Sequence, residues 1–470
     1  MRRTVIWLAA VMILAVAWGC KGETAWRGSI ETTDGVQVVR NPEAPMYPQG
    51  ALQLQEELTI GTADGADEYM FVRLRGIAVD DEGEIFALDQ RKPRVDVFSA
   101  DGRHLRSIGR RGQGPGEFQI PFFIALAPAG ELLVGEMGRL SFFERSGNFL
   151  RSLDNTVRQW AFVKYLENGD AVGTRMVMDE KNPRYEVSIC GPDFEPKSIL
   201  ASSPMPDPSG KFALFTSVAR WDISGGREIV CADGQEGYRL SVYDAGGRLT
   251  WSILKQHDPV PVTDPDIERQ MKQHGFQSRD EVTIPRFLPP IWWVYADEDG
   301  RFFVSTWQRD PDSGIARFNI FDAEGRYLCD YLIPGEPLVF KNGKLYAIVQ
   351  DEEGFQYIKR YRMIWKLEIG PKVGSQASPP IPARLVTAPA VGVHRSPIID
   401  IVSRPRILSS YKGRHGPISP FPPVTLSGSP SIPGGRHDHN EEESQGDHPR
   451  RQESREERRG NLHDRHAFRG

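Results

Sequence analysis

The sequence predicts an all-β protein, a six-bladed β-propeller built from four-stranded antiparallel blades. Three observations predict this fold. Six glycine-containing turns separate short apolar runs, a second turn follows in most units, and a glycine-rich decapeptide joins two similar units. A four-stranded unit of this kind cannot bury both of its faces alone, so the units are expected to stack radially around an axis.

The first turn of each unit has a glycine at its tip, usually beside Asp, Asn or Glu. Acidic-Gly and Asn-Gly tips indicate β-hairpins, because glycine adopts the positive φ that tight hairpin turns require. The six tips lie at residues 80–83, 128–130, 167–169, 224–226, 297–300 and 341–343. The second turns lie at residues 100–102, 145–147, 245–247 and 323–325.

Residues 109–118, with four glycines and one proline, cannot form a helix or a regular strand. One interpretation is a phosphate-binding loop, which runs from a buried strand into a helix. No helical periodicity follows here, since residues 120–127 are apolar and strand-like. The decapeptide is therefore interpreted as a connector between blades, with Phe118 filling an apolar gap between neighbouring sheets.

The segment RVDVFSADGRHLR at residues 94–106, continued by SIGRRGQGPGEF at residues 107–118, resembles the bacterial six-bladed β-propeller lipoproteins, relatives of the NHL-repeat propellers. In that group a strand ending V-F-x-x-D-G runs into G-x-x-G-x-G-P-G-E-F, which links one blade to the next. The resemblance is close over residues 75–136 and looser over residues 52–365. It implies six blades; a two-sheet sandwich is the alternative, but it gives no reason for a regular two-turn repeat.

The propeller is expected over residues 52–367. Its sixth unit lacks a strand after residues 351–354, and we expect Leu52–Ile60 to complete that blade and close the ring. Residues 255–290 interrupt the repeat. A helix is predicted from about Asp264 to His274, because Pro265 stands in its first turn and acidic residues surround it. Such insertions map to loops on one face, often the binding face.

Residues 1–20 are typical of a bacterial lipoprotein signal peptide. A positive start precedes an apolar run that is too short to span a bilayer comfortably, and small residues precede Cys20, the expected lipidation site. An ordinary signal peptide and an uncleaved anchor are the alternatives. Lys21 after the cysteine implies the outer membrane if the cell has two membranes, with the domain in the periplasm or at the cell surface. Residues 21–51 are expected to be a linker from the membrane.

Residues 368–470 are rich in Pro, Ser, Arg and His, and this polar composition predicts a disordered tail. Histidines there, such as His437 and His439, also suggest metal binding, but composition favours disorder. Three further cysteines, Cys190, Cys231 and Cys329, are expected to be buried free thiols, although one pair could bridge in an oxidising compartment. No Cys-x-x-Cys spacing indicates zinc, and no metal or cofactor site is predicted.

No catalytic motif with diagnostic spacing is present, and a net charge of −5 does not favour nucleic acid as a partner. The candidate site is instead the mouth of the channel, where the innermost strands begin. Arginine and tryptophan at these positions could pair with anions and stack on planar or sugar rings. The alternative is that the tryptophans pack between blades and the arginines bridge neighbouring carboxylates. The ligand-binding candidates are Arg73, Arg75, Trp160, Arg220, Trp292 and Trp293.

Two classes of function remain open. The first is a membrane-anchored, non-catalytic binding module for a protein, peptide or glycan, consistent with the lipid anchor and the lack of a catalytic set. The second is a propeller hydrolase or lyase of the lactonase type, which usually needs a metal held by acids and Asn at the channel. No matching ligand set can be assigned in the sequence.

Overall fold

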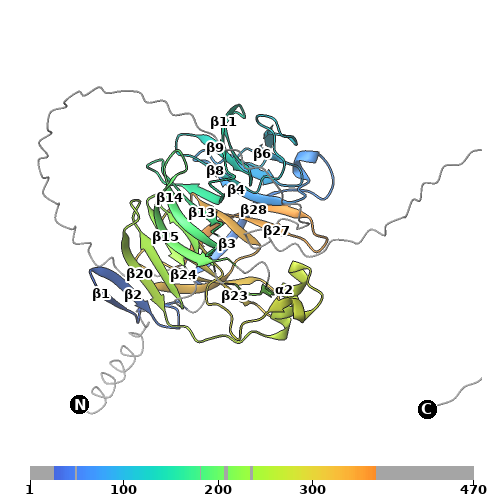
Figure 1. Cartoon of the computed structure of the whole chain (residues 1–470). Coiled ribbons are helices and arrows are strands. Elements are labelled where there is room, and N and C mark those ends of the chain that lie inside the picture. The colour runs from blue at the N-terminus through green and yellow to red at the C-terminus, as the bar shows by residue number, and fades with distance from the viewer. Residues whose placement is uncertain are drawn as a thin grey trace, which may run out of the picture. The chain divides into compact units, whose positions relative to one another are not determined.

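The computed structural model describes residues 26–47, 50–179, 181–205, 210–216, 218–232 and 237–366. These residues form six large sheets that follow one another along the chain, and one small two-stranded sheet (Figure 1). Each blade contains four antiparallel strands, and the first of them lies innermost. The fold is therefore the six-bladed β-propeller that the repeat predicts.

The first three blades each use four consecutive strands. Blade 1 contains β4 (Leu74–Val79), β5 (Ile85–Asp89), β6 (Arg94–Phe98) and β7 (His104–Ile108). Blade 2 contains β8 (Phe123–Leu126), β9 (Glu131–Gly135), β10 (Arg139–Glu144) and β11 (Phe149–Asp154). Blade 3 contains β12 (Trp160–Tyr165), β13 (Ala171–Val177), β14 (Arg184–Cys190) and β15 (Pro196–Pro204).

The other three blades repeat this order with two additions from the N-terminal region. Blade 4 contains β17 (Arg220–Ser224), β18 (Glu228–Ala232), β19 (Arg239–Tyr243) and β20 (Leu249–Lys255). Blade 5 contains β22 (Trp293–Ala296), β23 (Phe302–Arg309), β24 (Ala316–Phe321) and β25 (Tyr327–Leu332). Blade 6 contains β26 (Glu336–Lys341), β27 (Lys344–Gln350), β28 (Gln356–Trp365) and the early strand β3 (Leu52–Ile60).

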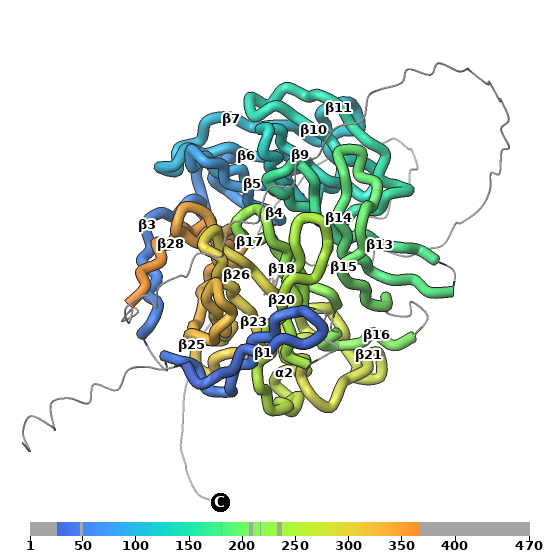
Figure 2. The backbone as a smooth tube through the Cα atoms, turned by 90° about the vertical axis from the view of Figure 1, so that its left-hand side faces the viewer, coloured from blue at the N-terminus to red at the C-terminus, as the bar shows by residue number. Residues whose placement is uncertain are grey.

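Strand β3 closes the ring, as predicted for Leu52–Ile60. It pairs antiparallel with β28 from Ile60 opposite Ile358 to Leu52 opposite Trp365. Figure 2 shows the blue β3 beside the orange β28, although about three hundred residues separate them in the chain. This pairing hides an edge of β28 that would otherwise offer unpaired backbone groups.

The segment before β3 differs from the expected linker. Strands β1 (Ser29–Thr33) and β2 (Val36–Asn41) form a hairpin, and β2 pairs in parallel with β20. The hairpin therefore extends blade 4 to six strands, visible in Figure 1 as the dark blue pair beside β20. Val39 is fully buried there, whereas every residue of β1 is exposed. A polar sequence can still form strands when a neighbouring sheet offers an open edge.

The decapeptide at residues 109–118 connects blades 1 and 2, as predicted. Gly109 has φ +76°, and a Cβ at this position would lie 2.1 Å from the ring of Phe118. Phe118 is fully buried in the core that blades 1 and 2 share, against Phe143. Glu117 accepts a hydrogen bond from the backbone N–H of Gly114 at 2.9 Å, which closes the loop on itself.

The insertion between blades 4 and 5 contains the predicted helix, α2 (Asp264–His274). Thr263 and Asp266 form a capping box at its start, and Gly275 ends it in the left-handed conformation. The insertion also contains the 3₁₀ helix η2 (Arg279–Glu281) and β21 (Val282–Thr283), which pairs with β16 (Phe212–Ala213). A further 3₁₀ helix, η1 (Asp67–Tyr69), precedes blade 1. Ile267 of α2 belongs to a small separate core with Leu214, Phe215 and Leu288.

The three cysteines lie in different blades, and each is buried, as expected. The signal peptide predicted at residues 1–20, the lipidation site predicted at Cys20 and the tail predicted from residue 368 onward lie outside the described residues. Within the described part of the chain, no helix is both long and apolar enough to cross a bilayer.

Candidate functional site

The innermost strands of all six blades surround a central channel. They are β4, β8, β12, β17, β22 and β26, and residues of each line a cavity of about 280 Å³. Apolar side chains such as Ile77, Ile124 and Val339 alternate there with a few polar ones. We call the end at which these strands begin the entrance, and the end with the six glycine tips the tip end.

Ion pairs between blades hold polar groups at and near the tip end of the channel. The Nζ atom of Lys341 lies 2.6 Å from Asp81 and 2.9 Å from Glu298, which come from the tips of two other blades. Further inside, Lys164 lies 2.6 Å from Asp222, whose other oxygen accepts from the backbone N–H of Ala296 at 3.0 Å. Both lysines are already paired with carboxylates, so these groups offer little to an anionic ligand.

Arg220 lies at the entrance and is only 7% exposed. Its guanidinium carbon lies 4.4 Å from the centre of the Trp293 ring and 5.2 Å from that of Trp292. Burial lowers the pKa of Arg220 to about 9, which still leaves it charged at neutral pH. Among the described residues, no carboxylate lies within 4 Å of this guanidinium, and none accepts a hydrogen bond from it.

The two indoles at Arg220 are held by different elements. Trp293 begins β22, and Trp292 packs on Trp307 of β23 with ring centres 4.1 Å apart. Trp307 in turn contacts Phe215, which belongs to the small core of the insertion. The insertion therefore supports one wall of the entrance at Arg220.

Glu336 begins β26 in blade 6, and it interacts electrostatically with Arg75 of β4 in blade 1. Burial raises the pKa of Glu336 to about 7, against the opposing charge of Arg75. Burial also lowers the pKa of Arg75 to about 10. Arg75 donates from Nε to Oε1 of Gln90 at 3.2 Å rather than to a carboxylate. The entrance thus contains a carboxyl group that changes protonation near neutral pH.

All six sequence candidates stand within two residues of the start of an innermost strand, at the entrance, but of these six Arg75 alone lines the cavity and Trp160 is buried in a core. Four of them are partly buried, namely Arg73, Arg75, Trp292 and Trp293, and Arg220 is buried. Trp160 is fully buried between blades 2 and 3, where its Nε1 donates to the carbonyl of Phe194 at 3.0 Å. Its assignment to the mouth is wrong, because a large indole with a satisfied N–H is most stable inside a core.

Sequence reasoning missed Glu336 and the Lys164–Asp222 pair. The signal for Glu336 was available, since it begins the innermost strand of the sixth blade as Arg220 begins that of the fourth. The pair could not be recognised in the same way, because it depends on how two blades face each other.

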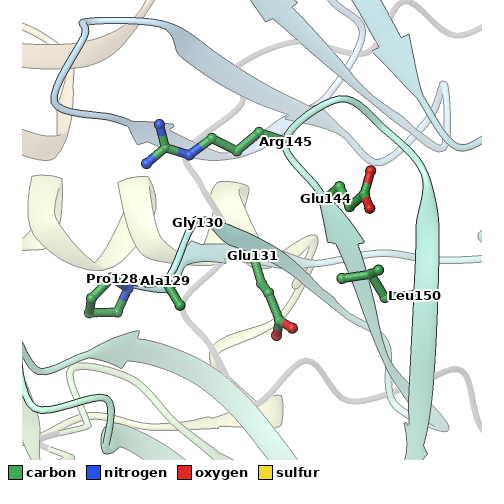
Figure 3. Close-up of a pocket in the computed structure, with 7 residues that line it drawn as sticks. All are labelled: Pro128, Ala129, Gly130, Glu131, Glu144, Arg145 and Leu150. Carbon is green, nitrogen blue, oxygen red and sulfur yellow. The ribbon is translucent and has the colours of Figure 1, made fainter.

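A second hollow, of about 380 Å³, lies at the turns of blade 2 (Figure 3). It is lined by Pro128, Ala129, Gly130, Glu131, Glu144, Arg145 and Leu150. Arg145 points away from the hollow's two glutamates and pairs with Asp80 and Glu82 of blade 1. The polar side chains that line this hollow do not point toward one another, so the channel entrance is the better candidate for a binding site. Across the described residues, no group of three or more His, Cys, Asp or Glu is placed to hold a metal.

Residues 64–127 match the protein family described as "6-bladed beta-propeller". No curated protein matches the chain. A protein of Bacteroides fragilis provisionally described as exported is similar, with 12% identity, a TM-score of 0.47, and coverage of 70% of this chain and 100% of that one.

Two proteins with assigned properties are also similar. Virginiamycin B lyase from Staphylococcus aureus has 12% identity and a TM-score of 0.36, covering 67% of this chain and all of its own. The calcium-binding protein regucalcin from Agrobacterium tumefaciens has 13% identity and a TM-score of 0.37, and the match covers 63% of this chain and 92% of regucalcin. The strand pairing and the match over residues 64–127 identify the chain as a six-bladed β-propeller.

Proposed function

We propose that this chain is an exported, lipid-anchored β-propeller that binds a protein, peptide or glycan at its channel entrance without catalysing a reaction. The composition of residues 1–20 supports export, and Cys20 supports a lipid anchor, in the outer membrane if the cell has two membranes. In this function Arg220 pairs with an anionic group of the ligand.

One observation carries the proposal, namely that Arg220 is buried without an acidic partner. Burying a cation is costly unless it is paired, and the cation–π contacts to Trp292 and Trp293 recover only part of that cost. A ligand carboxylate would supply the missing partner through two parallel hydrogen bonds, which the planar guanidinium is suited to donate.

The chemistry of this site is recognition. The indoles of Trp292 and Trp293 lie against the guanidinium, which limits the directions from which an anion can approach it. Arg75 and Glu336 lie at the same entrance, and Glu336 changes its charge near neutral pH. We therefore expect anion binding to be weaker above pH 7, where Glu336 carries a negative charge.

The test is to titrate the full chain, purified in detergent, with citrate at constant ionic strength and to follow tryptophan fluorescence and the melting temperature. Citrate should shift both signals, because binding to the folded state stabilises it. Chloride at the same ionic strength should not.

The variant Arg220→Gln should lose the citrate response while remaining folded, since it removes a buried charge. Arg248→Gln, an exposed arginine of the same blade that pairs with Asp244, is the matched control and should respond as the wild type does. An unchanged response in Arg220→Gln, or none in the wild type, would reject the proposed site.

The alternative of a metal-dependent hydrolase or lyase has no observed ligand group to support it in the described residues. Metal analysis of the purified protein tests that alternative directly, since one bound divalent ion per chain would favour it over a binding module.

A further inference from the structure

Four arginines gather on the blade 1 side of the entrance, and we call Arg73, Arg75, Arg91 and Arg111 the arginine cluster. Gln90 connects two of them, since its backbone N–H donates to the carbonyl of Arg73 at 2.9 Å and its side chain accepts from Arg75. Arg111 donates to the carbonyl of Arg91 at 3.0 Å. The mutual repulsion is evident in Arg73, whose pKa is lowered by burial and then by the charge of Arg91.

No member of the arginine cluster forms an ion pair within 4 Å with a carboxylate of the described residues. Arginines at the turns of the tip end behave differently, because several of them pair with nearby acids. Examples are Arg227 with Glu167, Arg301 with Asp297 and Asp299, and Arg326 with Asp322 and Glu324. Asp89 lies beside this cluster, but it accepts from the backbone N–H groups of Arg73 and Arg91, at 3.2 and 2.8 Å, and not from their guanidinium groups. The guanidinium groups of the cluster are therefore left without an ion pair at the entrance, where they can attract anions.

Exposed apolar side chains occupy the same end of the blades. Of the ten large apolar side chains that are exposed among the described residues, six lie in connections into innermost strands or in turns between second and third strands. We call these six the entrance rim: Val72, Ile120, Met137, Val157, Met178 and Phe287. Val72 adjoins Arg73, and Ile120 precedes Pro121, whose carbonyl accepts from Gln90 at 3.1 Å.

This composition distinguishes between possible ligands. Sugars are recognised largely through flat aromatic rings and neutral hydrogen-bonding groups, and five of the six rim residues are aliphatic or thioether side chains. Aliphatic side chains beside arginines suit a polypeptide that presents both apolar and acidic residues.

We propose that the arginine cluster and the entrance rim bind an acidic, partly apolar segment of a partner protein. Carboxylates of that segment pair with Arg73, Arg91 and Arg111, and its apolar side chains cover Val72 and Ile120. The proposal rests on the proposed function in placing the ligand at the entrance, and it names the class of that ligand.

The test measures the affinity of the full chain in detergent for a synthetic peptide of alternating glutamate and leucine or alanine. Two matched peptides replace every glutamate by glutamine or every leucine by serine. Both should bind at least about tenfold more weakly, because each lacks one of the two kinds of contact. Affinity for the acidic peptide should fall as salt rises.

The triple variant Arg73→Gln, Arg91→Gln and Arg111→Gln should weaken peptide binding by about tenfold or more. The matched control Arg227→Gln, Arg248→Gln and Arg326→Gln makes the same change in net charge at paired arginines and should leave the affinity nearly unchanged. A ligand-free readout accompanies this test. At low salt the cluster variant should melt no lower than the wild type, because it removes repulsion between arginines. The control variant should melt lower than the wild type, because it loses ion pairs.

Equal binding of the acidic and amide peptides, or equal weakening by both triple variants, overturns the proposal. Binding of heparin but not of the acidic peptide also overturns it, in favour of a polyanionic glycan. Failure of the proposed function is distinguishable, because it concerns citrate and Arg220, whereas this test concerns the peptide and the arginine cluster.

Discussion

The guanidinium of Arg220 in blade 4 lies against the ring of Trp293 in blade 5, with its central carbon 4.4 Å from the ring centre. A contact of this kind at a desolvated position is worth about 2 kcal/mol. We predict that a double-mutant cycle of Arg220→Met and Trp293→Leu gives a coupling energy of about 1–2 kcal/mol in urea unfolding. Additive effects of the two substitutions would show that the pair does not interact.

Asn41 connects the N-terminal hairpin to blade 5. It is buried, donates to the carbonyl of Gly325 at 2.8 Å, and accepts from the N–H of Tyr327 at 2.8 Å. Asn41→Ala leaves both backbone groups unpaired, so it should lower the free energy of unfolding by about 3 kcal/mol. Asn148→Ala, whose side chain bonds only within its own exposed turn, should change it by less than about 0.5 kcal/mol. Similar values for the two would contradict the bridging role of Asn41.

Glu336 should make stability depend on pH. Its pKa in the folded protein is about 7, above its ordinary value of 4.5, so the fold favours the protonated form. The stabilising contribution is complete below about pH 4.5 and is lost as the pH rises through 7. Glu336→Gln, which mimics the protonated form, should therefore match the wild type near pH 4.5 and exceed its stability by up to about 3 kcal/mol at pH 8.5.

Unfolding in urea at the two pH values measures this difference. Glu353→Gln, in an exposed turn of the same blade, is the control and should show a small effect at both. A Glu336→Gln effect that is the same at pH 4.5 and 8.5 would mean that this carboxyl has an ordinary pKa.

Gly109→Ala tests the connector between blades 1 and 2. The new methyl group would meet the Phe118 ring, and alanine also disfavours φ +76°. We expect a loss of at least about 2 kcal/mol in thermal or urea unfolding. Gly169→Ala has a similar φ of +87° but no atom within 4 Å, so it should cost only the backbone part, about 1 kcal/mol. Equal losses would mean that Phe118 moves aside freely.

Removal of β3 should open the ring. A chain that begins at residue 62 leaves the β28 edge unpaired and should aggregate or melt without cooperativity. A chain that begins at residue 42 loses only the hairpin and should melt cooperatively. Addition of a synthetic peptide covering residues 50–62 should restore the first chain, measured by circular dichroism and size-exclusion chromatography. Cooperative melting without the peptide would refute the closure role of β3.

The turns, the helix and the closing strand could be predicted because each depends on local chemistry or on a count of strands. Glycine tips specify hairpins wherever they occur, and Thr263, Pro265 and Gly275 define α2 from both ends. Only the sixth unit lacks a fourth strand, so the strand before the first unit was the natural candidate to supply it.

The hairpin of β1 and β2 could not be predicted, because its strands are stabilised by the open edge of β20 rather than by their own pattern. The burial of Trp160 also depends on a neighbour, since Phe142 and Phe194 of two different blades enclose it. The sequence places an arginine or a tryptophan at the start of a strand, but the spacing of adjacent blades decides whether it faces the channel or the core.

The pairing of Leu52 with Trp365 has a consequence for biosynthesis. The ribosome makes the first of these residues long before the second, so the circle stays unfinished until nearly the whole propeller has been translated. The waiting N-terminal strand is an unsatisfied partner during that time, open to wrong pairing with other blades or other molecules. Folding should therefore end with a slow late step set by the joining of distant chain segments.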